Sequence, residues 1–255
     1  MKKTLKVGIA ILTLCIVVVS LTACGKAEEP KNDVGVANSS SKETENVKNP
    51  VATMEVEGYG TMKIELYPEI APTTVSNFIL LANNKFYDGL TFHRIMKSFM
   101  IQGGDIKGDG TGSPTLSWID TSIKKGSDKD KEYCIIGEMT ANGHNNNLKH
   151  EKGVISMARA DYTMYDSRLT EESYNSGGSQ FFIMTTTYPS LNGLYAAFGK
   201  VIEGLDVLDK IANTKVSEMN DENSKPVKPP VIKQIRVETF GKDYGKPETV
   251  DPFGT

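Results

Sequence analysis

The sequence contains little cysteine: Cys15, Cys24 and Cys134 are the three in a chain of 255 residues. The first two belong to the N-terminal stretch, and a lone Cys134 cannot form an internal disulfide. No disulfide framework therefore supports the fold. Cys134 lies in the apolar run YCIIG, which predicts a small buried hydrophobic residue rather than a nucleophile.

The sequence also lacks an excess of either charge, since its formal net charge is -3. Domains that bind nucleic acid usually carry a clustered basic surface. We therefore expect no nucleic acid partner. With 38% hydrophobic residues, the chain is long enough to bury one sizeable core or, at most, two small ones.

Hydrophobic runs long enough for a comfortable transmembrane helix are lacking as well, because the apolar run from Val7 to Val19 is too short. Lys2, Lys3 and Lys6 precede this run. A positive segment followed by a short apolar one is typical of a secretory signal peptide. We predict that residues 1–23 form such a signal.

The signal ends in Leu21-Thr22-Ala23-Cys24, which resembles a bacterial lipobox. This resemblance implies cleavage before Cys24 and a diacylglycerol on its thiol, and so a lipid-anchored protein of the cell membrane that faces away from the cytoplasm. A small-residue cleavage site near Ala23 is the alternative, and it would give a freely secreted protein. Removing residues 1–23 takes away three lysines and no acid, so the net charge changes from -3 to -6.

The next segment, residues 24–50, is polar and contains no aromatic residue. Such a composition cannot bury enough apolar surface to offset the entropy of ordering, so we predict a flexible tether. We expect a folded domain at 51–242 and a C-terminal tail at 243–255.

Alternating apolar residues from Met54 to Leu66, around Gly58-Tyr59-Gly60, predict a β-hairpin with one buried face. Helical spacing predicts two helices, one after Pro72 and one within Gly204 to Ala212. The remaining apolar stretches bring the count to seven or eight short strands, without a repeated strand-helix rhythm. The pattern favours an all-β dominated fold, an antiparallel barrel whose open ends are covered by helices. A two-lobed solute-binding lipoprotein is not favoured, because its architecture needs repeated strand-helix units.

Two stretches could be mistaken for ligand sites. The glycine-rich run from Gly103 to Gly112 lacks the context of a phosphate loop, and as a calcium loop it has Lys107 and Leu116 where acidic ligands belong. His144 and His150 have no third ligand at suitable spacing. We therefore expect no metal and no cofactor.

The run from Phe92 to Asp105, FHRIMKSFMIQGGD, predicts two strand pieces that carry one arginine and one glutamine. It closely resembles the signature of the cyclophilin family of peptidyl-prolyl cis-trans isomerases. Three further motifs follow in the family's order: GVISMARA, GSQFF and LNGLYAAFGKVIEGLDVLDKI. The resemblance covers about residues 53–240. It implies a closed, eight-stranded antiparallel β-barrel capped by two α-helices.

Site roles follow from the resemblance where the residues match. Arg94 corresponds to the catalytic arginine, and Gln102 to the residue that orients it. The expected substrate-binding residues are Phe99, Met100, Ala158, Arg159, Gln180, Phe182, Leu191 and Tyr195. Taken alone, Arg94 could equally form a surface ion pair, and the apolar residues could simply pack in the core.

The sequence departs from the family pattern at several places. Ser190 stands where many members have tryptophan, which puts strong cyclosporin binding in doubt, and Arg159 replaces the commoner asparagine. Two insertions, about Trp118 to Lys131 and Asp161 to Ser176, could border the groove. The sequence leaves their role open.

The resemblance implies a monomeric enzyme that rotates X-Pro bonds in proline-containing peptides and in exported proteins as they fold outside the cytoplasm. The alternative is a surface module for protein binding or adhesion, with incidental or lost isomerase activity. Both follow from the same groove, so only activity separates them.

Overall fold

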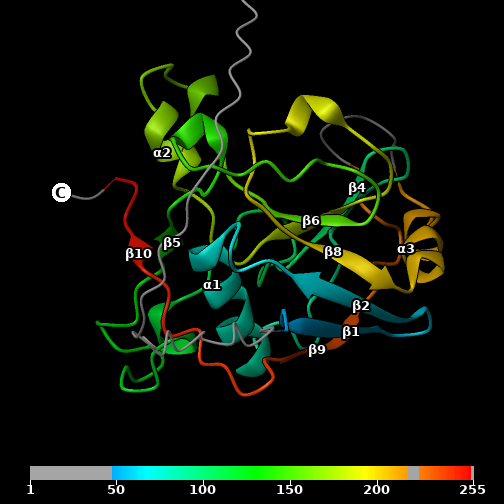
Figure 1. The fold of residues 1–255 in the computed structure, drawn as a ribbon, viewed down its shortest axis with the longest axis horizontal. Helices are drawn as coiled ribbons and strands as arrows, with labels where there is room; N and C mark the ends of the chain where they lie inside the picture. The colour runs from blue at the N-terminus through cyan, green and yellow to red at the C-terminus, as the bar shows by residue number, and fades with distance from the viewer. Residues whose placement is uncertain (1–47, 218–223, 254–255) are drawn as a thin grey trace, which may run out of the picture. The chain divides into compact units, whose positions relative to one another are not determined.

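The computed structural model describes residues 48–217 and 224–253. One eight-stranded antiparallel sheet dominates, with the strand order β3-β4-β7-β6-β8-β2-β1-β9 (Figure 1). The strands of this sheet are β1 (Val51–Val56), β2 (Gly60–Leu66), β3 (Arg94–Met96), β4 (Met100–Gly103), β6 (Val154–Met157), β7 (Phe181–Met184), β8 (Ala197–Glu203) and β9 (Ile232–Glu238).

The expectation of a closed barrel is wrong, because β3 and β9 remain the edges of an open, curled sheet. Beside these edges, an isolated bridge joins Thr91 to Val231, and the Ile95 amide donates to the Ser224 carbonyl at 2.8 Å. The segment before β9 contains Pro229 and Pro230, which have no N–H to donate to a ladder. β3 therefore lies beside an irregular connection rather than beside a strand.

The predicted hairpin is present: β1 and β2 pair in register from Val51 opposite Glu65 to Val56 opposite Gly60. Alternate residues of both strands are buried, as the period of two along a strand requires. Gly60 has a φ of +126°, and a Cβ there would lie 2.9 Å from the Val207 side chain. The turn into β2 thus needs glycine both for its backbone and for its contact with the neighbouring helix.

Three α-helices are described, α1 (Pro72–Asn83), α2 (Thr170–Tyr174) and α3 (Leu205–Ala212), so the expectation of two is also wrong. The extra helix is short and lies within the predicted insertion at residues 161–176. Figure 1 places α3 at one end of the domain and α2 at the other. The 3-10 helices are η1 (Leu116–Trp118), η2 (Thr140–Asn142), η3 (Tyr162–Met164) and η4 (Pro189–Leu191).

An aromatic cluster joins α1 to the sheet. Phe78 of α1 is fully buried, and its ring lies 5.8 Å from that of Phe181 and 5.3 Å from that of Phe198. Each such buried ring contributes about 1.5–3 kcal/mol relative to an exposed one. This packing fixes β7 and β8, whose other faces reach the candidate site.

The start of α1 is held by a side chain distant in sequence. Ala71 at the N-cap has no side chain that can cap the helix. The buried Glu138 carboxylate instead accepts hydrogen bonds from the backbone amides of Thr73 at 2.9 Å and Thr74 at 2.8 Å, and from the Thr74 hydroxyl at 2.7 Å. A carboxylate here satisfies unpaired first-turn amides and interacts favourably with the helix dipole.

The predicted C-terminal tail, 243–255, runs back along the domain. Its strand β10 (Thr249–Val250) pairs with β5 (Cys134–Ile135) in a separate two-stranded sheet. Cys134, which the sequence predicted to be buried, is a free and only partly buried cysteine in β5, and this degree of burial raises the pKa of its thiol to about 11. The thiolate is therefore disfavoured at neutral pH, as expected of a structural cysteine.

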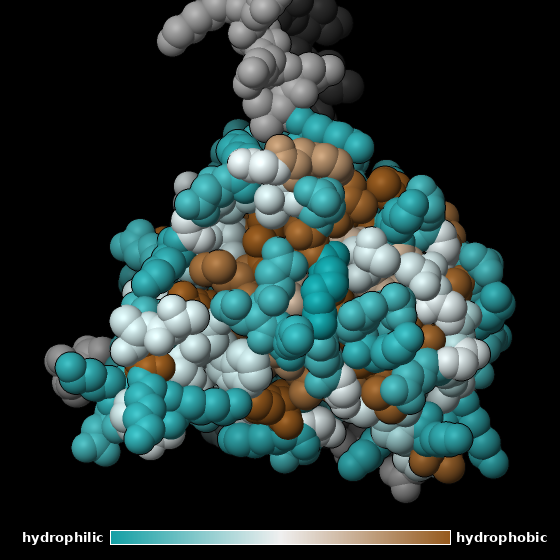
Figure 2. All heavy atoms as spheres, turned by 90° about the horizontal axis from the view of Figure 1, so that it is seen from below, coloured by the Kyte–Doolittle hydropathy of each residue, from teal (hydrophilic) through white to brown (hydrophobic). Residues whose placement is uncertain are grey.

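The predicted signal, Cys24 and nearly all of the predicted tether lie outside the described residues. Within the part of the chain that the structure describes, no helix is long and apolar enough to cross a membrane. On the face seen in Figure 2, hydrophobic residues lie in separate patches among hydrophilic ones.

Candidate functional site

The site begins with two paired strands. β3 and β4 come from the FHRIMKSFMIQGGD run and pair antiparallel, which places Arg94 opposite Gln102 and Met96 opposite Met100. β4 in turn pairs with β7, so that Gln102 lies opposite Phe182. Residues about eighty positions apart in the sequence therefore become neighbours on one face of the sheet.

A small cavity of about 160 Å³ lies over this face. It is lined by Arg94, Phe99, Met100, Gln102, Ala158, Arg159, Phe182, Leu191 and Tyr195. These are nine of the ten residues that the resemblance implies for catalysis and substrate binding. The volume is below the 300–1,000 Å³ typical of cofactor and drug-sized ligand sites. The cavity is thus suited to a small apolar group.

The floor of the cavity is apolar and tightly packed. Met100 and Phe182 are 1% and 5% exposed, and they form one cluster with Val154, Met184 and Ala197. Phe99, Leu191, Tyr195 and Ala158 pack against this cluster and are only partly buried. The fixed floor and accessible walls would hold an apolar ring and exclude water from one side of it.

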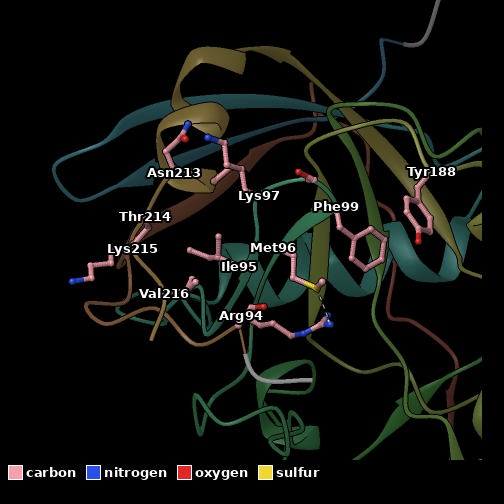
Figure 3. Close-up of a pocket in the computed structure, with 13 residues that line it drawn as sticks. Arg94, Ile95, Met96, Lys97, Phe99, Tyr188, Asn213, Thr214, Lys215 and Val216 are labelled. Atoms are coloured by element: carbon pink, nitrogen blue, oxygen red, sulfur yellow. Dashed lines mark hydrogen bonds between the residues drawn. The ribbon is translucent and has the colours of Figure 1, made fainter. Parts of the chain in front are cut away.

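Arg94 lies at the edge of this cavity and is half-buried. Its Nη2 donates to the Met96 sulfur at 3.1 Å. Figure 3 marks this contact with a dashed line. Its guanidinium lines the same cavity as the buried apolar floor, and hydrogen bonds from charged donors are stronger in such a place than in bulk water. A group bound in the cavity would therefore meet a charged donor at its edge.

Gln102 acts within a chain of amide groups. Its Nε2 donates to Gln180 Oε1 at 3.0 Å, and the Gln180 Nε2 donates to the carbonyls of Gly110 and Gly112, each at 3.0 Å. The role of Gln102 as an orienting residue for Arg94 was implied by the resemblance alone. Among the described residues its hydrogen bond goes to Gln180, so Gln102 contacts Arg94 through strand pairing rather than through its amide.

Gln180 itself lines a second cavity of about 210 Å³, which shares Gln102, Ala158 and Arg159 with the first. The glycine-rich run from Gly103 to Gly112 forms one wall of this cavity through Gly110 and Gly112. The two cavities thus form adjoining parts of one groove.

A third cavity, of about 860 Å³, shares Arg94 and Phe99 with the small one (Figure 3). Its walls include Met96, Tyr188 and the residues after α3. The Tyr188 ring packs against that of Phe99 with 4.7 Å between centroids. Ser190, which stands where many family members have tryptophan, is exposed. Tyr188, two residues earlier, supplies an aromatic neighbour for Phe99.

His150 supports the floor, a role that its sequence context did not predict. It is 1% exposed and stacks on Phe182 with 6.1 Å between ring centroids and 17° between planes. Its Nε2 lies 2.9 Å from the Ser156 hydroxyl, and its backbone amide donates to Asn192 Oδ1 at 2.8 Å. No group of three or more potential metal ligands is found within residues 48–217 and 224–253.

Burial lowers the pKa of both His93 and His150. Asp105 and Asp109 raise the pKa of His93 and Arg94 lowers it, but burial has the largest effect. Both imidazoles are therefore held neutral in the folded protein. Neither ring nitrogen of His93 has a hydrogen-bond partner in the described part of the chain, so a proton on this ring would carry a charge that no hydrogen bond there compensates.

We predict that the free energy of unfolding falls as the pH drops below about 6.5, the pKa of an unfolded histidine. The unfolded chain then binds more protons than the folded one, so the stabilisation is complete above that pH and is lost toward the lower native pKa values. Each histidine can contribute a slope of at most about 1.4 kcal/mol per pH unit. Urea unfolding between about pH 7.5 and about pH 5 measures it. A flat profile, or the same slope in a His93→Phe, His150→Phe double variant, would contradict the assignment.

Comparison with known proteins gives a consistent result. The model of the family described as "Cyclophilin type peptidyl-prolyl cis-trans isomerase/CLD" matches residues 51–237. Peptidyl-prolyl cis-trans isomerase B of Bacillus subtilis is 41% identical over 155 residues, covering 61% of this chain and 85% of that protein. A peptidyl-prolyl cis-trans isomerase of Helicobacter pylori is 37% identical over 179 residues, covering 69% and 90% of the two chains.

Among solved structures, a cyclophilin-type peptidyl-prolyl cis-trans isomerase of Cryptosporidium parvum, crystallised in the presence of the dipeptide Ala-Pro, matches with a TM-score of 0.57. It is 29% identical, and the match covers 74% of this chain and 98% of the other. Sequence and fold therefore agree over the part of the chain that carries the candidate site.

Proposed function

This chain belongs to the cyclophilin-type peptidyl-prolyl cis-trans isomerases, and from that premise we propose that it rotates X-Pro bonds of exported proteins outside the cytoplasm. The observation that carries the proposal is the small cavity with an apolar floor and Arg94 at its edge. We further propose that a lipid on Cys24 tethers the enzyme to the cell membrane.

The chemical task is to lower a rotational barrier. Rotation about a peptide bond passes through a twisted state that has lost amide resonance, at a cost of about 18–20 kcal/mol. The uncatalysed X-Pro step takes tens to hundreds of seconds. A rate gain of ~10⁶-fold would require ~8 kcal/mol of preferential stabilisation of the twisted state.

Arg94 can supply part of this stabilisation. In the twisted state the proline nitrogen becomes pyramidal and basic, whereas in the planar state its lone pair is delocalised. A fixed guanidinium donor therefore forms a stronger hydrogen bond to the proline nitrogen in the twisted state than in the planar ground state. Such preferential stabilisation of the transition state is the requirement for catalysis. No nucleophile and no metal take part in such a step.

The apolar walls would hold the proline ring while the chain on its N-terminal side rotates. The cavity is lined by Phe99, Met100, Phe182 and Leu191. Because the ring is already immobilised when the substrate binds, less entropy is lost when the bond rotates. The relative crystallised in the presence of Ala-Pro supports a proline-containing ligand for this cavity. The Gln102–Gln180 pair would keep the strand that faces Arg94 rigid.

A protease-coupled assay on a proline tetrapeptide tests the activity. We expect catalytic amounts of the purified chain to accelerate the slow phase, because protease cleavage of the trans form reports isomerisation directly. No acceleration would instead favour the alternative, a binding or adhesion module that uses the same groove.

Mass spectrometry of the mature N-terminus tests the anchor. We expect residues 1–23 to be absent and Cys24 to carry a diacylglycerol, since two acyl chains are needed for stable membrane attachment. A mature chain that starts elsewhere without lipid would contradict the anchor and leave the isomerase proposal intact.

A further inference from the structure

Arg159 lies where two cavities of the groove meet. It lines both the 160 Å³ cavity proposed for proline and the adjoining 210 Å³ cavity. An extended chain advances about 3.3 Å per residue. A side chain within two positions of a bound proline would therefore reach the second cavity and pass Arg159.

The charge of Arg159 has no carboxylate partner among the described residues. Within residues 48–217 and 224–253, the charged side chains that line the two cavities are Arg94 and Arg159, and none of the lining residues there is an acid. Arg159 therefore brings a positive charge to the groove of a chain whose net charge is -3.

The acids closest in sequence to these lining residues are already engaged. Asp109 Oδ1 accepts hydrogen bonds from the amide and hydroxyl of Thr111 at 2.9 and 2.7 Å. Asp161 Oδ1 accepts the corresponding pair from Thr163. Both carboxylates close their own turns and do not line the groove.

The guanidinium of Arg159 is held in place by two rings. Its central carbon lies 4.8 Å from the Tyr195 ring centroid and 5.2 Å from that of Tyr174, within the range of cation–π contacts. Its Nε donates to the Leu194 carbonyl at 3.3 Å and its Nη1 to the Ala160 carbonyl at 3.2 Å. A guanidinium has five N–H donors, so three remain for a ligand.

The inserted helix α2 positions one of these rings. Tyr174 is its last residue, and the next residue, Asn175, accepts hydrogen bonds through Oδ1 from the Gly137 amide at 3.0 Å and from Asn142 Nδ2 at 2.9 Å. A Cβ on Gly137 would lie 2.2 Å from the Tyr174 carbonyl oxygen. The insertion is thus hydrogen-bonded to and closely packed against the rest of the domain at Tyr174, the residue whose ring contacts Arg159.

We propose that the insertion at residues 161–176 holds Arg159 as a specificity determinant, and that the groove prefers substrates with an aspartate or glutamate within two positions of the proline. The inference rests on the proposed isomerase function. Arg159 pairs with the substrate carboxylate and takes no part in the rotation itself. A partly exposed ion pair is worth about two- to fivefold in specificity.

Matched peptides test the inference. Tetrapeptides that carry glutamate, glutamine or lysine at each position within two residues of proline are compared by kcat/KM. We expect the purified wild-type chain to favour glutamate over glutamine by about two- to fivefold at one position or more, and lysine to be the least favoured. Raising the salt to about 1 M shortens the Debye length to about 3 Å and should reduce the preference.

The variants separate a specificity role from a structural one. In Arg159→Gln the glutamate-to-glutamine ratio should fall to about one, whatever happens to the overall rate. It should be retained in Arg168→Gln, a control in the same insertion whose side chain is 87% exposed. An unchanged ratio in Arg159→Gln, or equal rates for all peptides in the wild type, would overturn the inference.

Binding distinguishes the inference from the function on which it rests. Fluorescence anisotropy gives dissociation constants for the same labelled peptides without any isomerisation. Tighter binding of the glutamate peptides by a chain that accelerates none of them would retain the role of Arg159 and reject the isomerase proposal. Equal binding and equal acceleration of all peptides would reject the role of Arg159 and retain the isomerase proposal.

Discussion

Replacing Arg94 with alanine is expected to lower kcat/KM for a proline tetrapeptide by about 10²- to 10³-fold, the effect of removing one charge-stabilising donor from an enzyme site. The melting temperature should stay nearly unchanged, because the side chain is half-buried at the edge of the cavity rather than in the core. A protease-coupled assay and a thermal unfolding curve on the same preparations measure both.

Two further variants separate charge from geometry in this test. Arg94→Lys keeps the positive charge but lacks the planar fork of donors, so its activity should lie between those of the wild type and Arg94→Ala. Arg168→Ala removes an arginine that is paired with Asp166 away from the groove, and full activity is expected. Wild-type activity in Arg94→Ala would remove the basis of the catalytic assignment.

Replacing Glu138 with alanine is expected to cost about 3–4 kcal/mol of unfolding free energy, because each buried donor left unsatisfied costs about 1–3 kcal/mol. The variant would leave three donors without an acceptor: the backbone amides of Thr73 and Thr74 and the Thr74 hydroxyl. Urea unfolding at neutral pH measures the loss.

Glu138→Gln is the matched variant, since its amide oxygen can still accept while the charge at the start of α1 is lost. We expect it to cost less than Glu138→Ala and more than Glu203→Gln, a control at an exposed ion pair with Lys63, where the effect should stay within about 1 kcal/mol. Equal stability of the wild type and Glu138→Ala would show that α1 does not depend on this carboxylate.

Local pattern was enough to predict several elements of the fold. The alternation from Met54 to Leu66 predicted the β1–β2 hairpin, and the spacing after Pro72 predicted α1, because both signals are contained in the chain segment itself. Arg94 and Gln102 lie in one short run, so their pairing across β3 and β4 follows from a single turn.

Contacts between distant segments were not predictable from these patterns. Whether the sheet closes depends on what reaches the outer edge of β3, and that is decided by the segment before β9, where Pro229 and Pro230 lie. The same holds for Glu138, whose neighbours IIG and M suggest a strand but whose partners lie in α1.

In the candidate site, too, some residues were predicted from the sequence and others were not. The resemblance brought nine residues to one cavity, because a family motif carries tertiary information that spacing lacks. It did not reveal His150 beneath Phe182, nor Tyr188 beside Phe99. The first contact joins a loop residue to β7, and the second joins a loop residue to the turn before β4. Loop paths are set by tertiary packing rather than by local periodicity.

The most direct test of the central claim is NMR exchange spectroscopy on an Ala-Pro peptide with catalytic amounts of the purified chain. Without enzyme the two isomers exchange over tens to hundreds of seconds and give separate signals. The account predicts exchange cross-peaks between the cis and trans signals with unchanged populations, and their loss with Arg94→Ala. Peptide binding to the wild-type chain without exchange cross-peaks would contradict it.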